Sequence, residues 1–223
     1  MAQGTAAQEI AAGVYWIDGG SSNFYLCVED DGLTLVDAGM PRREGLVWRL
    51  LAELGRQPAE LRRILVTHAD LDHVGSAAAL QAATGARVFA SAMAAELLVN
   101  GRSPAHMPAL VQFFLRFIKY RPIPADAIEV VQPGQVLPLL GGVQVLATPG
   151  HTLDHVSFYG AAAGVVFVGD ALNTRDGVLQ PTPPRITADH AAARDSARRL
   201  RELAPAVYAC GHGAPLAVMQ RGP

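Results

Sequence analysis

The 223-residue sequence predicts an α/β or α+β fold in which helices cover β-sheets. Three observations lead to this prediction. Short runs rich in β-branched and aromatic residues recur along the chain, segments with helical spacing of apolar residues stand between groups of these runs, and glycines or prolines separate most of them. Strands in groups on either side of helices are typical of sheets covered by helices. Residues 1–223 are expected to form a single domain, because this length is within reach of one large domain.

The first half of the chain alternates strands and helices. Strands are expected at 14–17, 24–28, 33–36, 64–66 and 87–89, where apolar and β-branched residues lie between turn-forming residues. Helices are expected at 41–54, which Gly55 ends, and at 74–83, which is rich in alanine and ends before Gly85.

The second half repeats this alternation. Further strands are expected at 128–131, 143–147, 156–159, 165–168 and 206–210. A helix is expected at 188–203. No repeat or low-complexity linker divides the sequence.

Composition excludes several classes of protein. Half of the residues are hydrophobic and 17% are charged, which excludes a disordered chain. The net charge of −2 argues against non-specific binding of nucleic acid, and two cysteines cannot form a disulfide framework. The first ten residues lack the pattern of a signal peptide, and no apolar stretch is long enough to span a membrane. We therefore expect a cytoplasmic protein.

The segment 109–120 is almost entirely apolar. Its polar residues, at 112, 116 and 119, fall on one narrow stripe of a helix, and prolines bracket the segment. One interpretation is a helix buried in the core. The others are a lid over an apolar substrate, a homodimer contact and a helix on a membrane surface; we favour the lid or the homodimer contact.

Four candidate metal ligands fall within six consecutive positions: His68, Asp70, Asp72 and His73. They begin where a buried strand is expected to end and finish where a helix is expected to begin, and strand ends are where α/β proteins build their sites. Imidazole and carboxylate groups suit Zn, Fe or Mn, and the absence of a nearby cysteine argues against a structural zinc site built from cysteines.

Three more candidates, His151, Asp170 and His212, each follow an apolar run and stand beside a glycine that permits a tight turn. In order, the seven residues resemble the signature of the metallo-β-lactamase superfamily, a His-x-His-x-Asp-His motif followed by a lone His, a lone Asp and a final His. Residues 36–39, with Asn23 ahead of them, resemble the early aspartate loop of that superfamily.

The resemblance implies a four-layer αβ/βα sandwich with a two-metal site in a cleft along one edge of the sheets. Carried over by position, the ligands of the first ion would be His68, Asp70 and His151, and those of the second would be Asp72, His73 and His212. Asp170 would bridge the two ions. A hydroxide between the ions would be the nucleophile, and Asp72 would be the catalytic residue that orients it or moves its proton.

Asp70 departs from the superfamily pattern, which has a histidine at this position. Zinc is the expected metal, but the shorter and charged side chain leaves open a harder first metal such as Mn or Fe, an altered affinity, or a single bound ion. Related flavodiiron reductases carry a glutamate here, so an iron-dependent oxidoreductase is an alternative, although no flavin-binding domain is visible. Asp154 stands where glycine is more usual, so the turn after His151 is expected to differ.

The remaining histidines are expected to be ordinary. His155 is interpreted as structural, His106 as a loop residue that only a lid would bring near the substrate, and His190 as solvated. Cys210 is interpreted as an apolar strand residue rather than a ligand.

These observations predict an enzyme, a binuclear metal-dependent hydrolase that cleaves an ester, lactone or thioester bond in a small molecule. The apolar segment 109–120 suggests an apolar substrate. A non-catalytic binding protein, whose apolar segment recruits a partner, is the second alternative.

Overall fold

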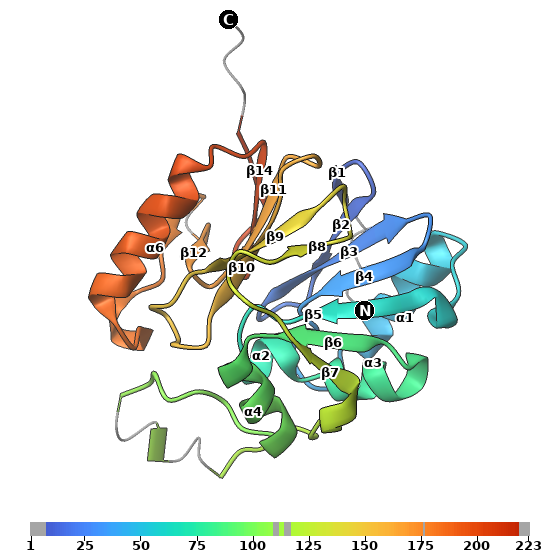
Figure 1. Ribbon diagram of the computed structural model, residues 1–223, viewed down its shortest axis with the longest axis horizontal. Coiled ribbons are helices and arrows are strands. Elements are labelled where there is room, and N and C mark those ends of the chain that lie inside the picture. Colours follow the sequence, from blue (N-terminus) through green and yellow to red (C-terminus); the bar gives the residue numbers. More distant parts are fainter. Residues whose placement is uncertain (1–7, 109–111, 114–116, 176, 219–223) are drawn as a thin grey trace, which may run out of the picture.

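The computed structural model describes residues 8–108, 112–113, 117–175 and 177–218. Within them, two main sheets lie face to face (Figure 1). The first sheet has seven strands, in the order β1 (Gln8–Ala11), β2 (Val14–Asp18), β3 (Asn23–Glu29), β4 (Gly32–Val36), β5 (Leu61–Leu65), β6 (Arg87–Ala90) and β7 (Ile128–Val130). Its first four strands pair antiparallel, and β4 to β7 pair parallel.

The second sheet has six strands, in the order β15 (Leu216–Ala217), β14 (Val207–Cys210), β11 (Val165–Gly169), β10 (Val156–Gly160), β9 (Val143–Ala147) and β8 (Val136–Leu137). Its strands are antiparallel except for the parallel pair of β11 and β14. A separate small pair is formed by β12 (Leu172–Asn173) and β13 (Gln180–Pro181).

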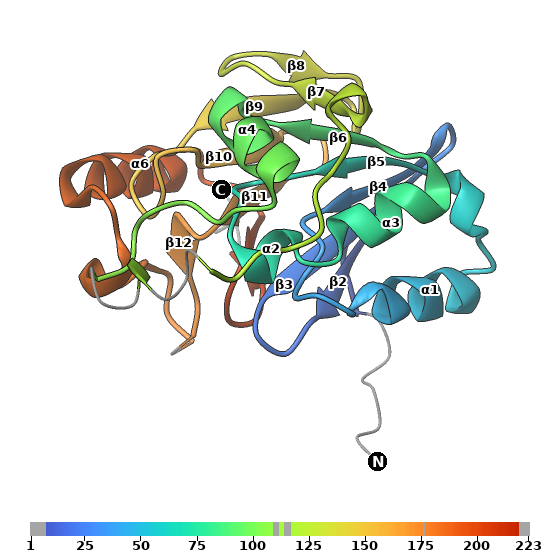
Figure 2. The same ribbon diagram turned by 90° about the horizontal axis from the view of Figure 1, so that it is seen from below.

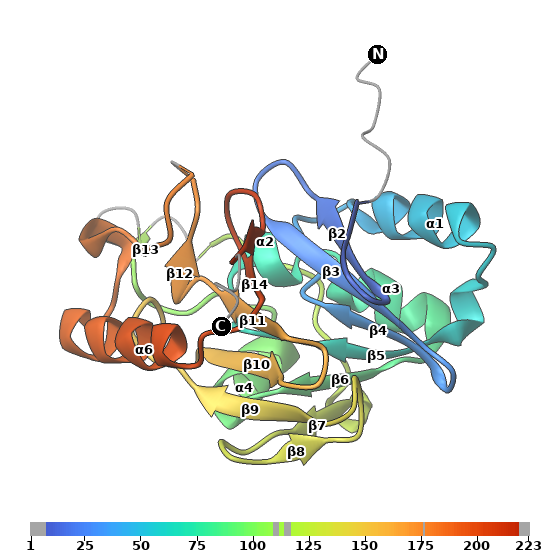
Figure 3. The same cartoon turned by 90° about the horizontal axis from the view of Figure 1, so that it is seen from above.

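Helices cover the outer faces of both sheets. On the first sheet these are α1 (Glu44–Glu53), α3 (Ala77–Thr84) and α4 (Ala92–Asn100), seen together on one side in Figure 2. On the second sheet α6 (His190–Glu202) lies across β11 and β14 (Figure 3). Short elements connect these layers: α2 (Leu71–Val74) and the 3₁₀ turns Pro58–Glu60, Ala125–Ala127 and Pro184–Ile186.

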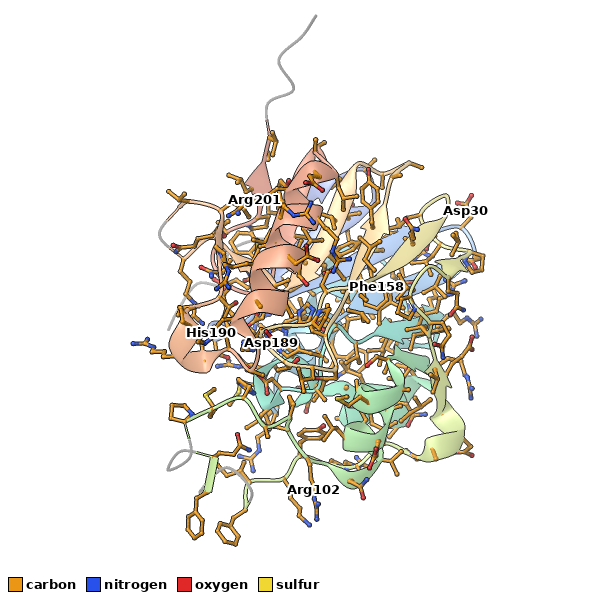
Figure 4. The ribbon with its side chains drawn as sticks, turned by 60° about the vertical axis from the view of Figure 1, so that its left-hand side comes forward. Asp30, Arg102, Phe158, Asp189, His190 and Arg201 are labelled. Carbon is orange, nitrogen blue, oxygen red and sulfur yellow. The ribbon has the colours of Figure 1, made fainter. Side chains whose placement is uncertain are left out.

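The alternation of side chains along the strands builds three apolar layers. In β11, Val165 and Phe167 pack between the two sheets, whereas Val166 and Val168 pack against α6. Phe158 of β10, labelled in Figure 4, lies in the layer between the sheets. The third layer joins α1, α3 and α4 to the first sheet. This arrangement of helix, sheet, sheet and helix is the expected four-layer αβ/βα sandwich.

Several predicted elements have different boundaries. The helix expected from residue 41 begins only at Glu44, because Arg42 has a left-handed φ of 67° that a helix cannot contain. The helix expected at 74–83 begins only at Ala77, as α3, because a turn at residues 75–76 separates it from the short helix α2. Helix α4 and the strands β1, β8, β12, β13 and β15 were not expected.

The apolar segment 109–120 is not a core helix along its described residues. Residues 112–113 are helical, but 117–120 are not, and residues 109–111 and 114–116 lie outside the described chain. Phe113 is 48% exposed, Phe117 66% and Ile118 49%, whereas Tyr120 is buried. Pro122 follows Arg121 and disfavours helical backbone at the end of the segment. None of the described helices is long and apolar enough to cross a membrane.

Candidate metal centre

The seven predicted ligands come from four segments, each of which follows the end of a strand in one of the two sheets. His68, Asp70, Asp72 and His73 follow β5 of the first sheet and run into α2. The other three follow strands of the second sheet: His151 follows β9, Asp170 follows β11 and His212 follows β14.

Backbone hydrogen bonds hold these loops together across the two sheets. The amide of Val156, at the start of β10, donates to the carbonyl of Thr67 (2.8 Å), and the amide of Asn23 donates to the carbonyl of Gly211 (2.7 Å). The side-chain amide of Asn23 also donates to the carbonyls of Cys210 (3.0 Å) and Gly213 (2.5 Å), on either side of the turn that carries His212. Asn23 therefore braces the last loop of the site.

The side chains gather into compact groups of possible ligand atoms. In each group the atoms lie within 4.8 Å of one another, and the groups are His68, Asp70 and His151; Asp72, His73 and His212; and His68, His73 and Asp170. The first two match the two ligand sets that the superfamily resemblance implies.

Asp170 lies between these two sets. Its Oδ1 is 3.3 Å from Nε2 of His73, and its Oδ2 is 3.1 Å from Nε2 of His212 and 3.5 Å from Nε2 of His151. Its carboxylate therefore faces histidines of both sets. Gly211 makes room for it, since a Cβ at this position would stand 2.4 Å from Asp170 Oδ1.

Hydrogen bonds to the Nδ1 atoms fix how three of the histidines present Nε2 to the site. His73 Nδ1 lies 2.9 Å from Asp37 Oδ2, and His151 Nδ1 lies 2.8 Å from the carbonyl oxygen of Ile186. His68 Nδ1 lies 3.0 Å from Thr67 Oγ1, whose own proton goes to Asp37. Since each partner accepts, each Nδ1 carries a hydrogen, so a ring that loses the proton from Nε2 directs that lone pair into the site.

Unpaired buried atoms indicate what the site fits. Within the described part of the chain, Nε2 of His68, Nε2 of His73 and Oδ1 of Asp170 are buried without a hydrogen-bond partner. Buried polar atoms in proteins almost always have a hydrogen-bond partner, so these unpaired atoms indicate that a bound ligand completes the site. Imidazole nitrogens and carboxylate oxygens that converge on one region can coordinate a divalent cation. This combination of ligands is suited to Zn, Fe or Mn.

The electrostatics of the chain agree with this fit. Burial alone would raise the pKa of Asp170, but His73 and His212 hold that pKa well below its usual value. Burial also opposes ionisation of Asp70, yet hydrogen bonding to His151 and His68 lowers its pKa. Both carboxylates are therefore ionised at neutral pH, which is the form that binds a cation.

The interpretation of His106 as an ordinary loop residue is wrong. Its backbone is in a loop, but its side chain is buried and its Nε2 lies 3.2 Å from Asp70 Oδ2. Its ring centroid is 4.6 Å from that of His151. The sequence carried no periodic signal for this, because the path of the loop depends on contacts far along the chain.

The other histidines and Cys210 lie as expected. His155 uses both ring nitrogens in the protein: Nδ1 lies 2.8 Å from Thr148 Oγ1, and Nε2 accepts from the amide of Asp170 (3.0 Å). His190 is exposed at the start of α6, beside Asp189 (Figure 4). Cys210 is buried against α6.

Asp154 gives the turn after His151 a specific partner. Its Oδ2 accepts a 2.8 Å hydrogen bond from the amide of Ala69, which stands between His68 and Asp70. Ser91 Oγ in turn donates to the carbonyl of Asp154 (2.7 Å). A glycine could not make the side-chain bond, so this chain ties its two ligand loops together in a way that the usual residue does not.

A four-layer sandwich with histidine and aspartate donors gathered at one edge defines a protein of the metallo-hydrolase class. The chain belongs to the metallo-β-lactamase superfamily, whose family model matches residues 17–212. It is 31% identical to the uncharacterized protein YobT of Bacillus subtilis (strain 168), over 86% of this chain and 82% of YobT. It is 28% identical to the probable metallo-hydrolase YflN of the same organism, over 95% of this chain and 88% of YflN.

Other similarities are partial or concern the fold alone. The chain is 38% identical to the hydroxyacylglutathione hydrolase of Pseudomonas entomophila (strain L48) over 55% of its length, and spans 38% of that enzyme. A solved structure described as the first B3 metallo-β-lactamase with an active-site glutamic acid has a TM-score of 0.76, with 23% identity over 96% of this chain and 84% of its own. The metallo-β-lactamase SMB-1 has a TM-score of 0.73, with 22% identity over 93% and 80%.

Proposed function

We propose that the chain is a binuclear metal-dependent hydrolase that cleaves the ester-type bond of a small molecule, with thioesters, oxygen esters and lactones as the candidate substrates. The observation that carries the proposal is the position of Asp170 between the two ligand sets, within 3.5 Å of histidines from both. The partial similarity to a hydroxyacylglutathione hydrolase supports the thioester class.

The proposed donors follow from the superfamily resemblance and are supported by the grouping of the ligand atoms. His68, Asp70 and His151 would hold the first ion, Asp72, His73 and His212 the second, and Asp170 both. Two divalent ions bound there would lower the pKa of water and polarise the carbonyl oxygen of the substrate. Zinc is the expected metal, with manganese or iron left open by Asp70.

Asp72 is proposed to carry the proton. Its side chain is 30% exposed, whereas those of His73 and Asp170 are buried, and its Oδ2 lies 3.6 Å from Nε2 of His212. A carboxylate at the open side of the site can accept a proton from attacking water and return it to the leaving group.

A pocket beside the second ligand set is proposed to receive the substrate. It has a volume of about 240 Å³, and its lining includes Trp16, Ser22, Asn23 and His212. Phe113, Phe117 and Ile118 are exposed on the segment 109–120, which follows His106 along the chain, so we propose that this segment forms a lid over an apolar part of the substrate. A homodimer contact through 109–120 is the alternative, and light scattering with Phe117→Ser would separate the two roles.

The test is a panel of thioesters, esters and lactones assayed with zinc, manganese or iron. The proteins compared are wild type, Asp170→Ala and, as a matched control, Asp195→Ala on the exposed side of α6. We expect hydrolysis of at least one class by wild type and by the control. A lost supporting residue of a metal site typically costs 10–100-fold, so losing the bridging carboxylate should cost more than about 100-fold. Equal activity in wild type and Asp170→Ala would refute the proposal.

The carboxylate at Asp70 favours one second candidate, an iron-dependent oxidoreductase. Anaerobic purification followed by elemental analysis and an oxygen-consumption assay decides between the two functions. Iron retained at the site together with oxygen consumption would favour the oxidoreductase, whereas zinc without oxygen consumption after iron loading would exclude it.

A further inference from the structure

His106 is carried to the metal centre by a loop that is fastened at its base. Helix α4 ends at Asn100 and is capped by Gly101, and the loop starts at Arg102, labelled at the lower edge of Figure 4. Tyr120 fastens it, because its hydroxyl donates to the carbonyl of Arg102 (2.7 Å) and its amide donates to the carbonyl of Gly101 (3.2 Å). The side chain of His106 is only 2% exposed.

A backbone carbonyl determines which nitrogen of the neutral His106 ring carries the hydrogen. Its Nδ1 lies 3.3 Å from the carbonyl oxygen of Pro104, which can only accept. In the neutral ring, Nδ1 therefore carries the hydrogen and Nε2 presents a lone pair. Nε2 is buried, has no hydrogen-bond partner among the described residues and faces Asp70 Oδ2 at 3.2 Å.

Two other imidazoles face the same oxygen in the same manner. Nε2 of His151 lies 3.2 Å, at hydrogen-bond distance, and Nε2 of His68 lies 3.5 Å from Asp70 Oδ2, while Nδ1 of each ring has a partner on the other side, away from Asp70. When these rings are neutral with the hydrogen on Nδ1, three Nε2 lone pairs face one carboxylate oxygen, and a cation among them would stabilise that arrangement. His155, by contrast, has both nitrogens paired and offers nothing to an ion.

We propose that His106 is an additional protein ligand of the first metal ion, and that it replaces the imidazole lost at position 70. The inference rests on the proposed metal site. With His106, the first set contains three imidazoles and one carboxylate from three separate loops. His106 lies outside the compact groups whose atoms are all within 4.8 Å of one another, so its loop must draw the ring further in when the ion binds. The ion would then fasten this loop over the site.

The test compares wild type with His106→Phe, which keeps an aromatic ring beside His151 but removes the nitrogen donors. His106→Ala is the second variant, in case phenylalanine disturbs folding, and His190→Ala at the exposed start of α6 is the matched control. Each protein is loaded with cobalt(II). Each coordinated imidazole with an Nδ1 hydrogen gives a solvent-exchangeable, paramagnetically shifted proton signal, and chelator competition gives the affinity.

We expect the His106 variants to lose one exchangeable signal and to bind the ion about 10–100-fold more weakly, while His190→Ala matches wild type. Because His106 compensates for Asp70, the Asp70→His background should remove the effect of His106→Phe on affinity. Unchanged signals and affinity would overturn the inference. A weaker affinity with all signals retained would also overturn it, since His106 would then act only by positioning Asp70.

These outcomes are distinct from a failure of the proposed function. If wild type took up no metal, both proposals would fall. If wild type took up metal regardless of residue 106, only the role of His106 would be refuted.

Discussion

Asp37 and His73 are joined by a 2.9 Å contact between Asp37 Oδ2 and His73 Nδ1, although they are 36 residues apart in the chain. Asp37 also accepts from the amide (2.9 Å) and the hydroxyl (2.8 Å) of Thr67. Every one of these neighbours donates, so Asp37 must be an acceptor on both oxygens. It thereby sets which nitrogen of His73 faces Asp170.

Asp37→Asn should weaken metal binding about 10–100-fold, because the amide nitrogen of asparagine would meet donors instead of accepting from them. Asparagine is compatible with the backbone conformation at this position, because Asp37 has a left-handed φ of 60° that Asn and Asp adopt more readily than most residues. The measurement is chelator competition with zinc, with circular dichroism as the control for folding. An unchanged affinity would show that His73 is oriented without Asp37.

Asp154→Ala should lower the free energy of unfolding by about 1–3 kcal/mol, because the buried amide of Ala69 loses its acceptor. Asp154→Asn should lose less, since its carboxamide oxygen can still accept. Asp154→Gly, which introduces the residue more usual in the superfamily, should behave like Asp154→Ala. Urea unfolding of the metal-free proteins measures all three, and equal stability of the alanine and asparagine variants would contradict the assignment.

Removal of metal should lower the melting temperature. The proposed ligands follow strands of both sheets, so bound ions would stabilise the folded chain by linking them. At a free metal concentration 100 times the dissociation constant, one site contributes about 2.7 kcal/mol. Calorimetry with and without a chelator measures the shift, and Asp170→Ala should show a smaller one. A melting temperature independent of the chelator would contradict metal binding to the folded state.

Cys27 should be inert toward thiol reagents in the native protein. Burial raises the pKa of the Cys27 thiol far above its ordinary value, so almost none of the reactive thiolate exists at pH 8. Its reactivity should increase only at strongly alkaline pH or on unfolding. Titration with a chromogenic disulfide reagent, with and without urea, checks this, and rapid native labelling of Cys27 would contradict the burial.

Local sequence predicted the parts of the fold that local chemistry determines. Strand β9 has the expected boundaries, because Val143 to Ala147 lie between turn residues. Helix α4 was missed even though local signals exist: Ser91 Oγ accepts from the amide of Ala94, and Gly101 ends the helix with a φ of 63°. These capping residues are informative only when they are considered together with the apolar run between them.

The ligand candidates could be predicted because their spacing is local or follows apolar strands. The contacts that hold these candidate ligands in place could not be predicted from the sequence. Asp154 reaches Ala69 across 85 residues, and His106 meets Asp70 only because α4 and Tyr120 fix the ends of its loop. Such contacts depend on how the two sheets pack, and no pattern within a short window of sequence encodes them.

The division of the donors between the two sheets has a consequence for biosynthesis. A ribosome makes the chain from residue 1 onward, so the four clustered donors emerge early, and Asp170 and His212 emerge only after most of the second sheet has been translated. The nascent chain therefore cannot assemble all seven proposed ligands until His212 has left the exit tunnel. The donors proposed for the first ion are available once His151 has emerged, so the second ion would be bound later in biosynthesis than the first.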